Sequence, residues 1–176
     1  MFIKKCMART LPLTGVILLS LGAASSVNAG TATANLSVTA SVTANCTITT
    51  SAVAFGAYDP VSANATTALT GTGSVNVTCT NGASTSVTLG QGSNANTGST
   101  DAAPARRLKD GATDFLTYEL YQDTAHSTVW GNTSGTGVAN TGTGSQVAIT
   151  VYGTVDAGQN VPAGSYSDTV VATVSF

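Results

Sequence analysis

The chain has 176 residues, of which 42% are hydrophobic and only 8% are charged. An average soluble domain carries roughly 25% charged residues, so this chain is poor in the Lys and Arg that nucleic-acid-binding proteins direct at phosphates. Low charge also disfavours long solvated helices, and a single His leaves little basis for His-dependent catalysis or a multi-His metal site. The abundant Thr, Val and Gly favour an all-β protein whose strands are joined by turns.

Residues 1–29 have the pattern of a secretory signal peptide. Three basic residues precede an apolar run over residues 11–21, and small residues lead to Ala29. A membrane anchor or a buried helix is the alternative, but spanning a bilayer takes about 20 apolar residues. Cleavage after Ala29 removes three of the six basic residues and none of the eight acidic ones, so the mature net charge becomes −5.

Cleavage also removes Cys6 and leaves two cysteines, Cys46 and Cys79. In an exported protein such a pair most simply forms one disulfide. For a separation of 33 residues the chain-entropy formula gives about 3.7 kcal/mol of stabilisation as an upper value. Two free thiols or half of a metal site are the alternatives.

The mature chain begins with an unusually long alternation of small or apolar residues with Thr, Ser and Asn, over residues 32–48. This period-2 pattern predicts strand with one buried face. As one strand the segment would span about 56 Å, whereas a globule of this size is about 38 Å across. A bend would divide it into two strands, but no Gly, Pro or Asp occurs between residues 31 and 45. The pattern therefore favours a part that projects and pairs elsewhere.

Further alternating runs predict strands near residues 74–79, 87–89, 116–121, 147–155 and 170–176. The Asn81–Gly82 pair predicts a hairpin between the first two of these. The count is about six main strands, one short of the seven of an immunoglobulin-like sandwich. A missing strand leaves an open edge, and a spare strand at the N-terminus could fill that edge in a neighbouring molecule.

The mature chain resembles the spore coat protein U domain family in a set of motifs that occur in order. The matching residues are Cys46, FGAYD at 55–59, CTNG at 79–82, 107–108, LTYELY at 116–121, VWG at 129–131, 152–153, and 161–176. The resemblance extends to the Csu-type pilins of the archaic chaperone–usher pathway. It implies an incomplete immunoglobulin-like sandwich without its last strand, which a periplasmic chaperone completes temporarily. At an outer-membrane usher, the N-terminal extension of the next subunit replaces the chaperone.

On this basis we divide the chain into a signal peptide (1–29), an N-terminal extension that acts as donor strand (30–41) and a pilin domain (42–176), whose first strand begins at Val42. The expected donor side chains are Ala32, Ala34, Leu36, Val38 and Ala40. The acceptor groove is expected beside the first strand and the C-terminal strand. The residues expected on the C-terminal side of that groove are Val170, Ala172, Val174 and Phe176.

Other residues have both an ordinary and a functional interpretation. We interpret His126 as a loop residue without a catalytic partner. Asp123, Asp156 and Asp168 lack an EF-hand ligand loop, and solvation explains them better than calcium binding. The charged stretch 101–123 is interpreted as solvated surface, with a subunit contact as the alternative.

Aromatic residues offer one more functional alternative, a carbohydrate site. The candidates for it are Phe55, Tyr58, Trp130 and Tyr166, which we instead expect to pack in the core and at corners.

The sequence thus predicts a non-enzymatic structural subunit of a bacterial surface fimbria that supports adhesion and biofilm formation. It is expected to be exported through the periplasm to the cell surface, with neighbouring subunits, a chaperone and an usher as partners. No nucleic acid, cofactor, metal or catalytic residue is expected. The alternatives are a tip adhesin that binds a surface or carbohydrate receptor, and a structural protein of a spore or cyst coat.

Overall fold

The structure is a computed structural model that describes residues 28–176. Within that range there are eight strands and no helix, which confirms the all-β class. The strands are β1 (Cys46–Ser51), β2 (Leu69–Cys79), β3 (Ser84–Leu89), β4 (Arg106–Lys109), β5 (Phe115–Tyr121), β6 (Val138–Thr141), β7 (Gln146–Val155) and β8 (Ala172–Ser175). Contacts divide the chain into two units, residues 1–40 and residues 41–176, and all eight strands belong to the second.

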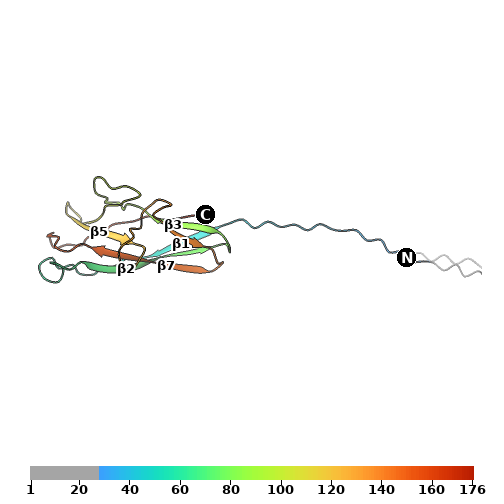
Figure 1. Cartoon of the computed structure of the whole chain (residues 1–176), viewed down its shortest axis with the longest axis horizontal. Coiled ribbons are helices and arrows are strands. Elements are labelled where there is room, and N and C mark those ends of the chain that lie inside the picture. Colours follow the sequence, from blue (N-terminus) through green and yellow to red (C-terminus); the bar gives the residue numbers. More distant parts are fainter. Residues whose placement is uncertain (1–27) are drawn as a thin grey trace, which may run out of the picture. The chain divides into compact units, whose positions relative to one another are not determined.

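The strands form two antiparallel sheets (Figure 1). One sheet has the order β1-β2-β7-β5-β4 and the other the order β6-β3-β8. The long ladder between β2 and β7 runs from Leu69–Val155 to Thr78–Gln146 and forms the middle of the larger sheet. Together the sheets make an immunoglobulin-like sandwich.

Side chains from the two inner faces fill the core, as the period-2 pattern requires. In β5, for example, Leu116, Tyr118 and Leu120 are buried while the residues between them are partly exposed. Trp130 is fully buried, and its indole N–H donates a hydrogen bond to the Val87 carbonyl at 2.9 Å. Trp130 therefore packs in the core, as expected, and a carbohydrate site built on it is wrong.

Two short strands, β4 and β6, were missed, so the count of about six main strands was too low. Each has only four residues, and neither RRLK nor VANT shows a clear alternation. The expected hairpin across Asn81–Gly82 is also wrong, because β2 and β3 lie in different sheets. Gly82 has φ of 80°, which suits a tight turn, but here that turn carries the chain from one sheet to the other.

The charged stretch 101–123 is not simply solvated surface. Arg106 is 1% exposed, and its guanidinium donates to the carbonyls of Leu89, Gly90 and Trp130 at 2.7–3.0 Å. It also forms an ion pair with Glu119. Burial raises the pKa of Glu119, against the opposing effects of the Leu120 N–H and of Arg106. Arg106 thus ties β4 to the loop that follows β3 and to Trp130.

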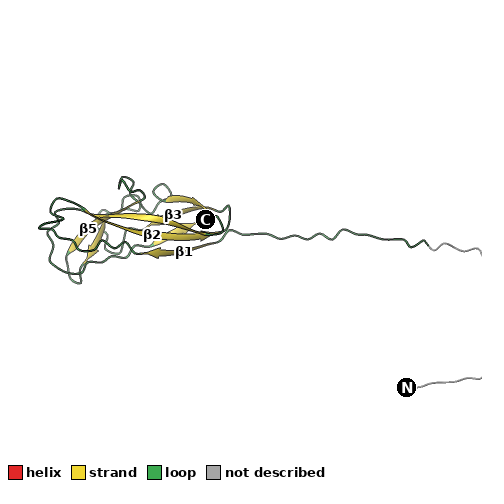
Figure 2. Cartoon of the chain, turned by 90° about the horizontal axis from the view of Figure 1, so that it is seen from below, coloured by secondary structure: helices red, strands yellow, loops and turns green. Residues whose placement is uncertain are grey.

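Residues 28–45 form no strand and are exposed, and Figure 2 colours this part of the chain as loop. The expected strand start at Val42 is wrong, since β1 begins at Cys46. The reason is the partner strand: Cys46 pairs with Cys79, the last residue of β2, so residues before Cys46 have no β2 residue opposite them.

The apolar run and basic residues of the expected signal peptide lie outside the described residues. No helix in the described part of the chain is long and apolar enough to cross a membrane.

Candidate functional site

Two sheet edges face solvent on the same side of the sandwich. Over residues 28–176, β1 pairs with β2 and with no other strand, and β8 pairs with β3 and with no other strand. These two edge strands approach each other, which places one edge of the larger sheet beside one edge of the smaller sheet. Each edge carries backbone N–H and C=O groups that can accept a further strand.

Two adjoining cavities open beside these edges: a smaller one of about 290 Å³, lined by the end of β1 and by Ala172 at the start of β8, and a larger one of about 740 Å³, lined mainly by the segments that follow β1 and precede β8. Both are lined by Val53, Phe55, Leu108 and Asp168, so they form one continuous depression. One wall consists of residues 50–58, which include the end of β1, and the other of residues 160–172, which lead into β8. The floor of the smaller cavity includes the core residues Val75, Leu89, Leu120 and Val151. We call this depression the β1–β8 groove.

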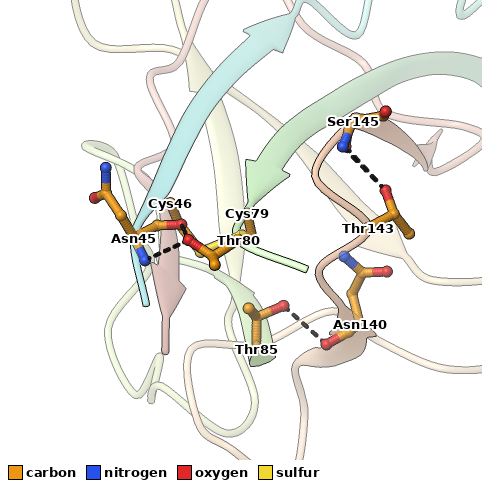
Figure 3. The surroundings of a disulfide bond; sticks show 8 residues. All are labelled: Asn45, Cys46, Cys79, Thr80, Thr85, Asn140, Thr143 and Ser145. Carbon is orange, nitrogen blue, oxygen red and sulfur yellow. Dashed lines mark hydrogen bonds between the residues drawn. A yellow bond between two sulfur atoms is a disulfide. The ribbon is translucent and has the colours of Figure 1, made fainter. Parts of the chain in front are cut away.

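A disulfide between Cys46 and Cys79 joins the first residue of β1 to the last residue of β2 (Figure 3). The expected pairing is therefore present. Next to it, the Asn45 N–H donates to the Thr80 hydroxyl at 3.0 Å, and the Thr80 N–H donates to the Asn45 carbonyl at 2.9 Å. These links hold β1 in place although it has a strand neighbour on one side alone within the described chain.

Beyond β1 the chain moves onto the inner face of the larger sheet, over three glycines that we call the glycine track: Gly71, Gly73 and Gly153. A Cβ on Gly73 would lie 2.7 Å from the Ser51 carbonyl oxygen, and one on Gly153 would lie 2.7 Å from the Phe55 ring. Any side chain there would collide with residues 51–55. The glycine track thus lets Val53 and Phe55 enter the space between the sheets, where Phe55 packs edge-to-face against Tyr118.

The opposite wall is formed by a segment that changes sheets. At Ser167 this segment exchanges two backbone hydrogen bonds of 2.9 Å with Lys109, the last residue of β4 in the larger sheet. Four residues later the Val171 carbonyl accepts from the Gly90 N–H at 2.8 Å, and β8 then pairs with β3. Of the expected acceptor residues, Val170, Ala172 and Val174 are half-buried, and Phe176 is 58% exposed. Val170 and Ala172 line the smaller cavity.

A polar pair lies in this otherwise largely apolar region. The Tyr118 hydroxyl donates to Asp168 Oδ2 at 2.7 Å, and Asp168 Oδ1 accepts from the Asn94 backbone N–H at 3.2 Å and from its side-chain amide at 3.0 Å. Burial, and then the Asp168 carboxylate, raise the pKa of Tyr118 well above its ordinary value. Asp168 fixes the point where the chain crosses between the sheets. Sequence reasoning treated it as a solvated loop acid and missed this role.

The five expected donor residues lie in the exposed segment before β1. Leu36 is 88% exposed and Val38 is 84% exposed, and the three alanines are exposed as well. Their assignment as donors stays a prediction, as does that of the acceptor residues.

Other candidate sites have structural roles. His126 lies in the loop after β5, with φ of 52°, and its ring packs edge-to-face against Tyr121 and Tyr152. Desolvation opposes ionisation of Asp123, but hydrogen bonds from Ser127 and Thr128 prevail and lower its pKa to about 2. Residues 28–176 hold no cluster of three or more His, Cys, Asp or Glu side chains that could bind a metal ion.

These features define a structural β-sandwich with an accessible groove between two edge strands. Residues 32–173 match the model of the Spore Coat Protein U domain, and the chain belongs to this family. The family is one of structural proteins rather than enzymes, which confirms that expectation. The chain is also 51% identical over 164 residues to "Protein U" of Myxococcus xanthus, covering 89% of this chain and 92% of that protein.

A solved structure shares the fold. It is the chaperone–tip adhesion subunit pre-assembly complex CsuC–CsuE from the archaic chaperone–usher Csu pili of Acinetobacter baumannii. The TM-score is 0.51 at 22% identity, and the match covers 77% of this chain. This chain spans 40% of the length of the solved chain.

Proposed function

We propose that this protein is a structural subunit of a bacterial surface fibre, polymerised by donor-strand exchange. The N-terminal extension of one copy enters the β1–β8 groove of the next. A periplasmic chaperone occupies the groove before assembly, and an outer-membrane usher exports the growing fibre, which supports adhesion and biofilm formation. The fibre is a homopolymer or contains related subunits.

The observation that carries this proposal is that one chain has both an accessible groove and an exposed segment with the alternation of a strand that pairs with no strand within the described residues. The β1–β8 groove has a largely apolar floor and two edges, β1 and β8, that can each accept backbone hydrogen bonds. The N-terminal extension offers alternating apolar side chains and has no charged residue. An uncharged strand enters a core without the cost of burying an ion.

The energetics favour such an exchange. Full burial of an aliphatic side chain such as Leu or Val contributes about 1.5–3 kcal/mol. Transfer of Leu36 and Val38 from water to the groove would therefore contribute about 3–6 kcal/mol before ladder hydrogen bonds are counted. The resulting interface is head to tail and does not close on itself, so it generates a fibre.

The comparisons support this proposal in two ways. The family match starts at residue 32, so it includes most of the N-terminal extension as well as the sandwich. The solved structure with the same fold is of a chaperone–subunit complex from a chaperone–usher pilus, which supports a chaperone as a partner of this chain.

Deletion of residues 31–40 tests the proposal in cells that contain the cognate chaperone and usher. We expect the shortened subunit to bind the chaperone but not to follow other subunits into a fibre, because its groove is intact and its donor strand is absent. The conservative variant Thr33→Ser, on the opposite face of the extension, should assemble normally. Fibres of normal length from the deletion variant would show that residues 31–40 are not the donor.

A structural protein of a spore or cyst coat is the second candidate. It is favoured by the 51% identity to Protein U across 92% of that protein, together with the family description. Fractionation of the source cells distinguishes the two: a surface fibre is released by shearing of vegetative cells, whereas a coat protein stays with purified spores or cysts.

A further inference from the structure

The outer face of the larger sheet carries no charged residue over β1, β2 and β7. The side chains on this face alternate with the core residues of the same strands, and strand pairing aligns them in rows across the three strands. Two of these rows are Thr49–Asn76–Ala148 and Ser51–Ser74–Thr150. All outward positions of the three strands are Thr, Ser, Asn, Gln, Ala or Tyr. We call this surface the hydroxyl face.

The charges of the mature chain lie elsewhere. Its basic and acidic residues are all outside β1, β2 and β7, and most of them fall in residues 101–123, which include β4 and β5. β4 is at the opposite end of the larger sheet from β1. Two copies with a mature net charge of −5 repel each other. That repulsion is weakest when the charged sides around β4 point apart and the hydroxyl faces meet.

The chemistry of the hydroxyl face fits a second copy of itself. A hydroxyl group both donates and accepts hydrogen bonds, so a surface of Thr and Ser is complementary to an identical surface. A charged partner would meet no opposite charge here. Twisted sheets pack face to face with their strands within about 30° of each other, so two such faces can lie against each other along the strands.

The size of the hydroxyl face indicates how strong one such contact is. β2 has 11 residues, and at about 3.4 Å per residue the face is about 37 Å long. Three strands spaced about 4.8 Å apart make it about 14 Å wide. Two copies therefore bury roughly 1,000 Å² in total, below the roughly 1,200–2,000 Å² of a stable specific interface. One contact is too weak to hold two free subunits together, but a fibre repeats it many times, and repeated weak contacts act together.

We propose that the hydroxyl face is a lateral contact between neighbouring fibres, in which it packs against the same face of a second copy. This inference rests on the proposed polymerisation, because only a fibre repeats the contact. Free subunits remain separate, whereas fibres associate side by side. The contact lies on the outer surface of the sandwich and is separate from the β1–β8 groove.

A charge swap on purified fibres tests this contact. One variant carries Thr72→Glu with Thr150→Glu, and the other carries Thr72→Lys with Thr150→Lys; both positions are exposed. Like charges then face each other within each variant. We expect the fraction of fibres that pellets at low speed to fall at least about tenfold for each variant alone. A mixture of the two should recover to within about twofold of the original protein, because opposite charges now meet.

The matched control is Thr97→Glu with Ser134→Glu, which adds the same charge at exposed loop positions outside the hydroxyl face. Its fibres should pellet like those of the original protein. Fibre length in electron micrographs should be unchanged in every variant, which shows that the variants fold and polymerise.

Salt provides a second measurement that needs no variant. Between 10 mM and 150 mM NaCl the Debye length falls from about 30 Å to about 8 Å, so repulsion between the acidic subunits weakens. Lateral association of the original fibres should therefore increase. A decrease would mean that ion pairs hold the fibres together, and it would overturn the inference.

The remaining outcomes separate this inference from the proposed function. Absence of fibres from the original protein would overturn both. Normal fibres that stay single, or that pellet equally well with Glu at positions 72 and 150, would overturn the lateral contact alone. Single fibres that bind dextran beads, and lose this binding in the Glu variant, would give the hydroxyl face a neutral polysaccharide as its partner instead.

Discussion

The N-terminal extension and β1 come from one alternating run of residues, yet they behave differently. In β1, Cys46 and Ile48 are half-buried and the strand pairs with β2 along its length. In the extension, with the same alternation, Leu36 and Val38 remain more than four-fifths exposed. The difference is the presence of a partner strand. An alternating segment can therefore form a strand that buries one of its faces. Whether it does so within the chain depends on whether the edge of another strand is available for pairing.

Val38→Asp should produce the largest effect, because it removes the ability of the extension to acquire a partner. An unpaired carboxylate in the β1–β8 groove would cost on the order of 5 kcal/mol at each junction. We expect SDS-resistant subunit ladders to disappear, as measured by electrophoresis of unboiled fibres.

The matched control is Thr39→Asp, which introduces the same charge on the opposite face of the extension. Its ladders should persist. Equal loss in both variants would mean that charge, rather than burial of position 38, disrupts assembly.

The next prediction concerns β1, the paired part of the alternating run. Removal of the disulfide tests how strongly this bond anchors β1. The double variant Cys46→Ala with Cys79→Ala should lose about 3–4 kcal/mol of unfolding free energy, because the unfolded chain regains the freedom of a 33-residue loop. Urea unfolding of the full chain measures this loss. Addition of a reductant to the original protein should lower its midpoint toward that of the variant, and an unchanged midpoint in both cases would contradict the role.

Gly73→Ala tests the close approach of residues 51–53, at the end of β1, to the larger sheet. The added Cβ would lie 2.7 Å from the Ser51 carbonyl oxygen and 2.8 Å from Val53, so residues 51–53 must shift. We expect a loss of about 1–3 kcal/mol in unfolding free energy, measured by thermal or urea unfolding. Gly135→Ala, where nothing lies within 4 Å of the added atom, is the control and should change stability far less.

Tyr118→Phe should have the smallest effect at neutral pH, about 1 kcal/mol for one lost hydrogen bond. Its pH dependence is more informative. The raised pKa of Tyr118 means that the folded protein holds this proton above pH 10, the ordinary value, while the unfolded chain releases it. Stability should therefore fall as the pH rises above about 10. The unfolding free energy should fall less steeply with pH in Tyr118→Phe than in the original protein. Urea unfolding at a series of alkaline pH values measures both curves, and the same dependence on pH in the two proteins would contradict burial of the hydroxyl.

The fold class was predictable because it depends on short-range patterns. The alternations at residues 74–79, 116–121 and 147–155 each became part of a strand with its apolar residues inward. The disulfide followed from cysteine count and export. β4 was not predictable, because its pairing with β5 and the contacts of its buried Arg106, whose guanidinium meets carbonyls from two distant segments, leave no alternation in the four residues of the strand. A buried arginine in a charged stretch has no local signal.

The candidate site was predictable only in part. The extension and the C-terminal run were identified from their alternation; the structure shows the extension exposed and the C-terminal run leading into the edge strand β8, and their roles as donor and acceptor stay predictions. The glycine track was missed, since Gly in a β-rich chain suggests turns, and only the path of residues 52–55 over Gly71, Gly73 and Gly153 explains these glycines. The polar pair of Tyr118 and Asp168 joins residues 50 positions apart.

The sequence by itself determined the all-β class, the low charge, the cysteine pair and the period-2 segments, because these depend on residue types and on neighbours along the chain. Tertiary structure decided the rest: that the Asn81–Gly82 turn joins two sheets instead of two paired strands, that Arg106 is buried, and that β1 and β8 are the strands whose edges flank the groove. Those outcomes depend on which strands pair over long sequence separations, and pairing between distant segments is settled by the packing of the whole sandwich.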